Sequence, residues 1–528
     1  MKRLAISLAL LATAVAAQAQ ISVGKGQLSG SIESNNIYYM EDSALAGSTP
    51  EDRFGSNSYL KVDYTLGRFS AGLQADAYLP VLQGFDMATY GAGHKFVLSS
   101  KYIQWQDRNF AVRVGDIFDQ FGSGILFRTW EDRALGFNNS LEGVRGAYNF
   151  NGYVSVKGVY GRPRLYDEYA SSWVRGADMS VSISEITGWD NGMLNLEGSY
   201  LNRHQNIDEV PDAEMLGLTS SDINMFSGRI NFAWQGLELR GEYVGKCNAD
   251  LYSPIHEAAR GNAWLAEAAY DYNRFAVSAS FRRLEHMSTM ASLIGGGTGN
   301  VINYLPALTR QYTYMLTNLN PYQVNAEGEI GGQADIYYSL RNRTDRSRYW
   351  NFHANFSTFY TLEENGGGEH RLLWRDINVD VERQWNRRLK TTLLYSRQEW
   401  NPSHGGINDD TYVSDIFVAD ITYKFDKKKS LRVEAQYLLS GDYEGDWAAA
   451  LVEFNVAPSW SVYASDMYNL GNETDKMHYY NAGVSWTHSR TRLQLSYGRN
   501  RAGYVCSGGV CRFSPAYTGF NLVLTSSF

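Results

Sequence analysis

The stretch FNLVLTSSF, residues 520–528, alternates between two kinds of side chain. Phe520, Leu522, Leu524 and Phe528 fall on one side of an extended strand, and polar or smaller residues alternate with them on the other. A final amphipathic strand that ends on Phe is typical of bacterial outer-membrane β-barrels, whose last strand closes the sheet against the first. The ending also resembles the signal read by the barrel-assembly machinery. Every other alternating segment thereby becomes a candidate strand with one face toward lipid.

Several internal segments show the same period of two. Apolar residues alternate with charged or small polar ones over 237–243, 275–282, 376–382 and 431–439. A soluble β-sandwich has the same alternation, so the period alone does not decide between the two folds. The number of such segments, taken with the C-terminal strand, favours the barrel.

The connections between these segments fall into two classes. Tight turns such as Gly67-Arg68 and Gln235-Gly236 alternate with longer polar or Gly-rich stretches, among them 41–56, 123–140 and 287–330. Short turns on the periplasmic rim and long loops outside are the asymmetry of outer-membrane barrels. We therefore predict an all-β, transmembrane antiparallel β-barrel of about 24 strands, within a range of about 18 to 26. The segment from Leu308 to Leu316 is either one more strand or a loop segment inside the lumen.

The N-terminal segment predicts export. Lys2 and Arg3 precede an apolar run from Leu4 to Ala17, and a small-x-small cleavage site follows. We expect a signal peptide over 1–19 and one barrel domain over 20–528. No later stretch has 18 apolar residues, and 37 Tyr, 13 Trp and 23 Phe suit the aromatic girdles of a barrel.

The densest group of unusual residues lies between the fifth and sixth predicted strands. In general diffusion porins the loop at this position folds into the lumen and narrows it, with acids facing bases. We predict that 123–140 forms such a constriction, since opposed charges in a narrow passage select solutes by sign. The alternative is a solvated surface loop held by local ion pairs. The constriction residues would be Arg128, Glu131, Asp132 and Arg133.

Further charged and polar residues, on strand faces or in the segment after the fifth strand, are expected to line the pore. They are Asp116, Gln120, Arg145, Glu238, Arg240, Arg432 and Glu434. Cys506 and Cys511 bracket four residues and are expected to form a disulfide in the oxidising envelope. These cysteines offer too few soft ligands for a metal site, and we expect neither metal nor cofactor.

Two blocks resemble a known family. The run GDIFDQFGSGILFRTWEDRALGFNNSLEGVR, residues 115–145, resembles an uncharacterised outer-membrane β-barrel family, porin-like, of the Bacteroidota. The stretch 308–338 is similar to a second block of that family. The resemblance implies a large barrel of undetermined transport role, and it supplies no catalytic residues.

These features predict a porin-like channel for passive passage of small hydrophilic solutes across the outer membrane of a Gram-negative cell. Its expected partners are outer-membrane lipid, lipopolysaccharide, the barrel-assembly machinery and the solute. The alternative is a structural or interaction barrel of a secretion or surface-assembly apparatus, with an occluded lumen. A barrel lipase is least favoured because no His-Glu-x-x-His or Ser-His constellation appears. We expect no enzyme, and the net charge of −8 argues against nucleic acid as a partner.

Overall fold

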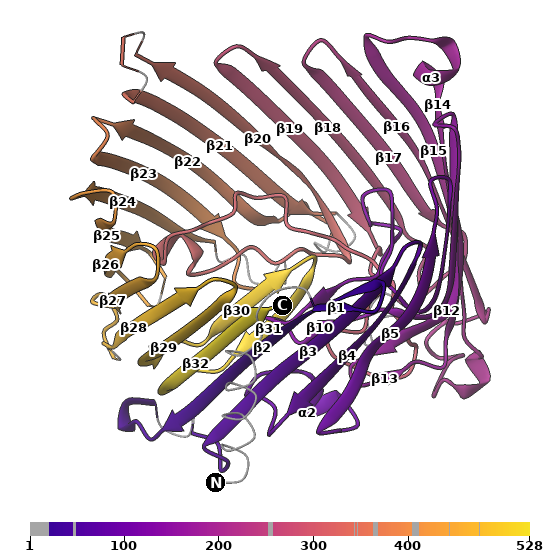
Figure 1. The fold of residues 1–528 in the computed structure, drawn as a ribbon, viewed down its shortest axis with the longest axis horizontal. Coiled ribbons are helices and arrows are strands. Elements are labelled where there is room, and N and C mark those ends of the chain that lie inside the picture. Colours follow the sequence, from indigo (N-terminus) through magenta and orange to yellow (C-terminus); the bar gives the residue numbers. More distant parts are fainter. Residues whose placement is uncertain are drawn as a thin grey trace.

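The computed structural model describes residues 21–45, 49–251, 257–342, 344–345, 347–362, 368–403, 411–442, 444–474 and 476–528. The expected signal peptide, 1–19, lies outside these residues. Within them the chain forms a closed, antiparallel β-barrel of 24 strands (Figure 1). The predicted fold class and the strand count are confirmed.

Each wall strand pairs with its neighbours in the chain, and β2 also pairs with β32 to close the barrel. The wall strands are β2 (Gly26–Met40), β3 (Phe54–Leu66), β4 (Phe69–Tyr78), β5 (Phe96–Gln106), β6 (Phe110–Ile117), β11 (Leu141–Phe150), β12 (Val154–Leu165), β14 (Trp173–Ser182), β15 (Gly192–His204), β16 (Asp222–Trp234), β17 (Leu237–Lys246), β18 (Asn262–Tyr272), β19 (Phe275–Glu285), β20 (Gly328–Arg341), β21 (Tyr349–Thr361), β22 (Leu372–Gln384), β23 (Leu389–Trp400), β24 (Tyr412–Lys424), β25 (Lys429–Ser440), β26 (Trp447–Val456), β27 (Trp460–Tyr468), β28 (His478–His488), β29 (Thr491–Asn500) and β32 (Tyr517–Ser527).

Shorter elements lie outside the wall or in its connections. The short strands are β1 (Ile21–Val23), β7 (Gln120–Phe121), β8 (Phe127–Arg128), β9 (Glu131–Asp132), β10 (Phe137–Asn138), β13 (Glu168–Tyr169), β30 (Gly503–Ser507) and β31 (Val510–Ser514). The helical segments are α2 (Met87–Tyr90), α3 (Ile183–Thr187) and the 3-10 turns η1 (Ser43–Leu45), η2 (Ile207–Glu209) and η3 (Leu316–Asn318). None of the helices among the described residues is long and apolar enough to cross a membrane.

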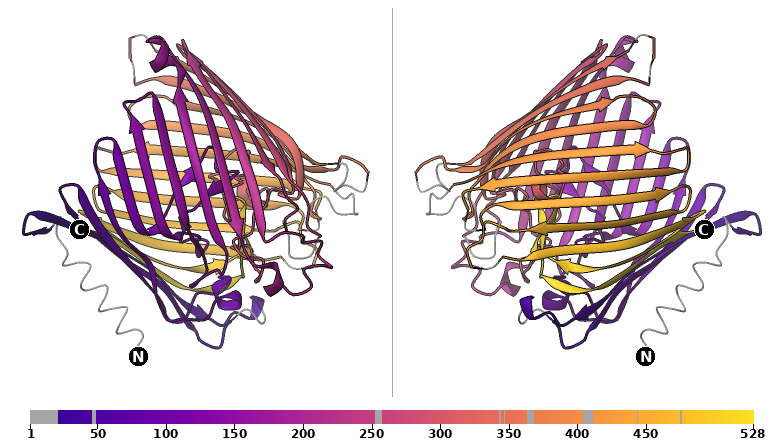
Figure 2. Two further views of the ribbon diagram at one scale, coloured as in Figure 1. Left: turned by 90° about the vertical axis from the view of Figure 1, so that its right-hand side faces the viewer. Right: turned by 90° about the vertical axis from the view of Figure 1, so that its left-hand side faces the viewer.

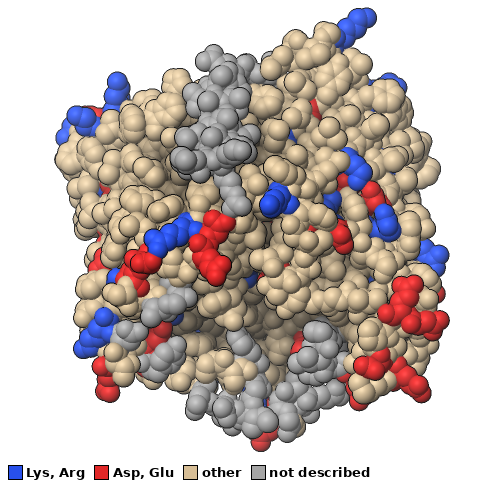
Figure 3. Space-filling view, turned by 90° about the horizontal axis from the view of Figure 1, so that it is seen from below, with Lys and Arg blue, Asp and Glu red and all other residues tan. Residues whose placement is uncertain are grey.

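The outward face of the wall is apolar. Ile421, Val433 and Val452 lie opposite one another on β24, β25 and β26, and they are 45%, 39% and 45% exposed. Figure 3 shows broad areas without Lys, Arg, Asp or Glu between scattered charged groups. Side chains of this kind, exposed in continuous rows, are expected to contact a solvent that is itself apolar.

The two rims differ in their connections. β3 ends at Leu66 and β4 begins at Phe69, whereas 118–140 separates β6 from β11 and 286–327 separates β19 from β20. Figure 2 shows the strands as inclined stripes around the wall, with the longer loops gathered at one end. The short-turn rim and the long-loop rim match the predicted asymmetry.

Candidate functional site: the lumen and its loops

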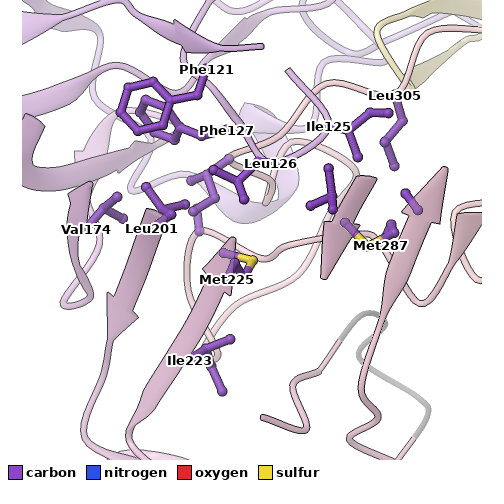
Figure 4. Close-up of a cluster of buried hydrophobic side chains, with 14 of the residues drawn as sticks. Phe121, Ile125, Leu126, Phe127, Val174, Leu201, Ile223, Met225, Met287 and Leu305 are labelled. Carbon is purple, nitrogen blue, oxygen red and sulfur yellow. The ribbon is translucent and has the colours of Figure 1, made fainter. Parts of the chain in front are cut away.

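The segment 118–140 lies inside the barrel. Phe121 and Phe127 are fully buried, with ring centroids 5.0 Å apart. They belong to an apolar cluster with Val174 of β14 and Leu201 of β15, on the inner wall near the long-loop rim (Figure 4). Removing these side chains from water holds the loop against the wall. The loop thus has the inward position that the constriction hypothesis requires.

The loop 286–327 completes this core and then crosses the lumen (Figure 1). Met287, Ile302 and Leu305 are buried in the same cluster. Residues 308–316 form a loop segment inside the lumen. They are not part of any sheet, so the prediction of a further strand there is wrong.

Residues 308–319, which we call the strap, are fastened to the opposite wall through alternating positions. Three side chains and one backbone amide bond to wall strands β22, β24 and β25. The bonds join Arg310 to Asp380, Tyr312 to Asp376, Tyr314 to Asp420 and the Leu316 amide to the Gln436 side chain. Gln311 and Thr313, which alternate with them, are exposed. Alternate residues of the strap therefore face the wall and the lumen, as they would in a β-strand.

Of the predicted constriction residues, Arg128 and Glu131 face an internal hollow of 480 Å³. The guanidinium of Arg128 lies 3.8 Å from the ring centroid of Tyr304, which belongs to the loop 286–327. The Glu131 carboxylate accepts a hydrogen bond of 2.6 Å from Gln74 of β4. These two charges sit where a luminal solute would meet them.

The other two predicted constriction residues, Arg133 and Asp132, stabilise the position of the loop 118–140. Arg133 donates to Glu33 of β2 at 2.8 Å, and its Nε lies 3.7 Å from Glu131. Asp132 accepts a hydrogen bond of 2.9 Å from the backbone of Ala134 and stabilises a turn. Arg133 and Asp132 therefore act mainly on the position of the loop.

Two of the predicted pore-lining residues are buried behind the loops. Asp116, at the end of β6, is fully buried and accepts hydrogen bonds of 2.7 Å from Tyr169 of β13 and 3.2 Å from Ser140 at the end of the inward loop. Glu434 is 3% exposed, beside Gln436 under the strap. The structure thus places neither carboxylate on the open lumen.

The remaining predicted residues lie on the luminal side. Gln120 and Arg240 line a hollow of 420 Å³, and Glu238 lines a hollow of 340 Å³ that Arg240 shares. Arg432 is half-buried and pairs with Asp420 at 2.9 Å.

Arg145 is bound to the inward loop through Asp119. Its Nε contacts one carboxylate oxygen of Asp119, and Lys157 Nζ lies 2.9 Å from the other. Burial acts to raise the pKa of Asp119, but the two cations outweigh it and lower the pKa below its ordinary value. This carboxylate therefore stays charged and ties the loop to β11 and β12. Sequence reasoning missed Lys157, because it lies on a strand far from the loop in the chain.

The C-terminal part of the long-loop rim carries a disulfide hairpin. Cys506 and Cys511 are joined by a disulfide between β30 and β31, and Cys247 is free and exposed. The hairpin contacts both inward loops, since the Leu305 amide donates to the Gly508 carbonyl at 2.8 Å. Arg512 also donates to the Ala134 carbonyl at 3.1 Å. Among the described residues there is no cluster of His, Cys, Asp or Glu that could hold a metal ion.

Comparisons with known proteins place the chain in one family. The model of a family of unknown function, DUF6029, matches residues 1–528. No curated protein matches the sequence significantly.

Several solved barrels are similar in outline. The translocation pore of the P pilus usher PapC is 10% identical, with a TM-score of 0.44 over 95% of this chain and 99% of that one. The siderophore receptor PirA from Pseudomonas aeruginosa is 9% identical, with a TM-score of 0.41 over 95% and 80%. The copper transporter OprC is 8% identical, with a TM-score of 0.42 over 97% and 82%. At these scores the likenesses carry no argument about function.

Proposed function

The chain belongs to the DUF6029 family of unknown function, and we propose that it is an outer-membrane channel for passive passage of small hydrophilic solutes. Its apolar outward face supports insertion in a bilayer, where only a closed barrel satisfies the backbone of β-strands. The partners in this proposal are outer-membrane lipid, lipopolysaccharide and the barrel-assembly machinery. Assignment to the Bacteroidota stays a prediction from the sequence.

The observation that carries the proposal is the charged lining inside the wall. Three luminal hollows of 420, 480 and 340 Å³ adjoin the inward loops, and each is lined by acidic and basic side chains. Charged side chains can form hydrogen bonds with hydrated solutes, whereas an apolar solute would desolvate them without compensation. The loops narrow the interior and bring charges of both signs close to any solute inside it.

A second candidate is an interaction barrel with an occluded lumen. The observation in its favour is the apolar core between the inner wall and the loops 118–140 and 286–327. A packed core of this kind resists opening, because water must enter it when the loops move. Planar-bilayer recording separates the two candidates, since an occluded barrel gives no conductance steps.

Arg128 provides the test of selectivity. We expect Arg128→Ala to shift the reversal potential across a salt gradient toward cation preference, because it removes a positive charge from a confined passage. Arg53→Ala removes one positive charge from an exposed loop on the same rim, where its side chain is 46% exposed. This control is expected to leave the reversal potential unchanged, since salt screens exposed charges beyond about 8–10 Å. An Arg128→Ala protein that conducts with unchanged preference contradicts the constriction.

The proposal includes no catalytic step. Hydrolysis of phospholipid by the purified protein, measured as released fatty acid, would contradict this part of it.

A further inference from the structure

A cavity of 430 Å³ opens inside the long-loop rim, apart from the charged hollows. It lies between the end of the strap, the adjoining ends of β22, β23 and β28, and the disulfide hairpin. Its volume falls within the range of about 300–1,000 Å³ that small-molecule sites occupy.

Aromatic rings form one side of this cavity. Tyr504 and Phe513 face each other across the hairpin, with ring centroids 5.4 Å apart and exposed fractions of 47% and 48%. Trp400 at the end of β23 lines the cavity beside them. The hairpin packs against the inward loop 286–327 through the bond between Leu305 and Gly508, and both rings line the cavity inside the rim and not the outward face of the wall. The disulfide fixes their backbone, and a ligand therefore meets a preorganised aromatic surface.

Polar groups complete the lining without adding net charge. Arg501 donates to Glu444 at 2.8 Å and to the Leu319 carbonyl at 3.1 Å, so the guanidinium and the carboxylate neutralise each other. Asn320 and Gln323 contribute amide side chains, each with both donors and acceptors.

We propose that this cavity binds a neutral carbohydrate. The electron-rich faces of aromatic rings attract the polarised C–H groups on the flat side of a sugar ring. Amides and a fixed ion pair supply donors and acceptors for its hydroxyl groups. A charged ligand is disfavoured because Arg501 and Glu444 already satisfy each other. A purely apolar ligand is disfavoured because it would cover the amides of Asn320 and Gln323 without offering them hydrogen-bond partners.

Binding is measured by isothermal titration calorimetry on the full-length protein. The detergent is a dimethylamine oxide, because alkyl maltosides carry a sugar that competes. The probes are maltohexaose, cellohexaose, xylohexaose and chitohexaose. We expect at least one of them to bind and Tyr504→Ala to weaken it by about tenfold, as loss of a stacking ring implies. Tyr504→Phe keeps the ring and is expected to bind nearly as the parent does.

Two controls make the outcome decisive. Tyr90→Ala removes another half-exposed ring, which lies outside the cavity, and is expected to bind normally. The intact disulfide of each variant, checked by thiol labelling, shows that the hairpin is folded. Absence of binding by all four probes overturns the proposal, as does equal binding by Tyr504→Ala. Binding of the apolar probe N-phenyl-1-naphthylamine in their place also overturns it. The measurement needs no conductance, so its failure is distinct from failure of the channel proposal.

Discussion

Gly115 occupies a position that other residues cannot take without strain. Its φ is +111°, and a Cβ there would lie 2.1 Å from the Lys101 carbonyl oxygen of β5. We predict that Gly115→Ala lowers the free energy of unfolding by about 1–3 kcal/mol, the usual cost of a strained backbone conformation. Gly146→Ala on β11 is the control, because a Cβ there meets nothing within 4 Å. Urea unfolding followed by tryptophan fluorescence distinguishes them, and equal midpoints would contradict the strain argument.

The two faces of β19 are distinguished by adjacent residues. Ala279 lies opposite Ala268 and Ala334 and shares the outward face with the exposed Phe281, whereas Ser280 lies opposite Glu267 and shares the luminal face with the buried Arg282. Near the midplane, Ala279→Arg should cost about 2–4 kcal/mol of folding free energy in a bilayer. Ser280→Arg, at the same depth, should be tolerated. Equal folding yields of the two variants in lipid vesicles would show that the face assignment is wrong.

A group of polar residues, which we call the clasp, holds the barrel seam together: Asp42, Arg499 and Thr518. Asp42, in the loop after β2, accepts hydrogen bonds of 2.7 and 2.9 Å from Arg499 of β29. It also accepts one of 2.6 Å from Thr518 of β32. The Arg499 bonds are the largest cause that lowers the Asp42 pKa to about 2. The clasp therefore joins the first loop to the last two wall strands.

The stability from this clasp depends on pH in a defined direction. Because the pKa of Asp42 is lower in the folded state, its contribution is full above about pH 4 and is lost as the pH falls toward about 2. Asp42→Ala should cost about 1–3 kcal/mol at pH 7 and flatten that part of the pH profile. Glu41→Ala is the control, since its carboxylate is 76% exposed. Unfolding free energies from pH 2 to pH 7 test this, and parallel profiles for parent and Asp42→Ala would contradict it.

The disulfide hairpin joins the two inward loops at the same rim. Labelling of the unfolded, unreduced protein with a thiol reagent should modify Cys247 alone, because Cys506 and Cys511 are paired. The bond closes a small ring, so its loss should cost near the lower end of about 2–4 kcal/mol. Modification of three thiols would show that the pair is reduced in the mature protein.

The strap crosses the lumen and is bonded to its wall, so we expect it to limit the passage. We predict that combining Arg310→Ala, Tyr312→Phe and Tyr314→Phe raises single-channel conductance and current noise, because it removes the side-chain bonds to β22 and β24. A matched variant changes Gln311 and Thr313 to Ala, on the side of the strap that faces away from the wall. It should conduct as the parent does. Identical conductance in the two variants would show that the strap does not limit the passage.

The wall of the barrel could be predicted because its determinants are local. The alternation from Leu431 to Leu439 already separates an outward apolar row from an inward polar one, and the two-residue turn after Leu66 fixes a hairpin. The alternation of a strand and the type of a turn are both determined by residues that are adjacent in the chain. The strand count and the approximate position of each rim follow from repeating such units.

The contents of the lumen could not be predicted in this way. The inward loop was expected from its composition, but the burial of Asp116 depends on Tyr169, and the place of Arg310 depends on Asp380. The cavity beside Tyr504 likewise joins segments that are distant in the sequence. The local sequence pattern therefore specifies the wall, through contacts between neighbouring strands. Which charges the loops cover and which they leave open depends on the three-dimensional fold, because loops pack by long-range contacts that leave no local period in the sequence.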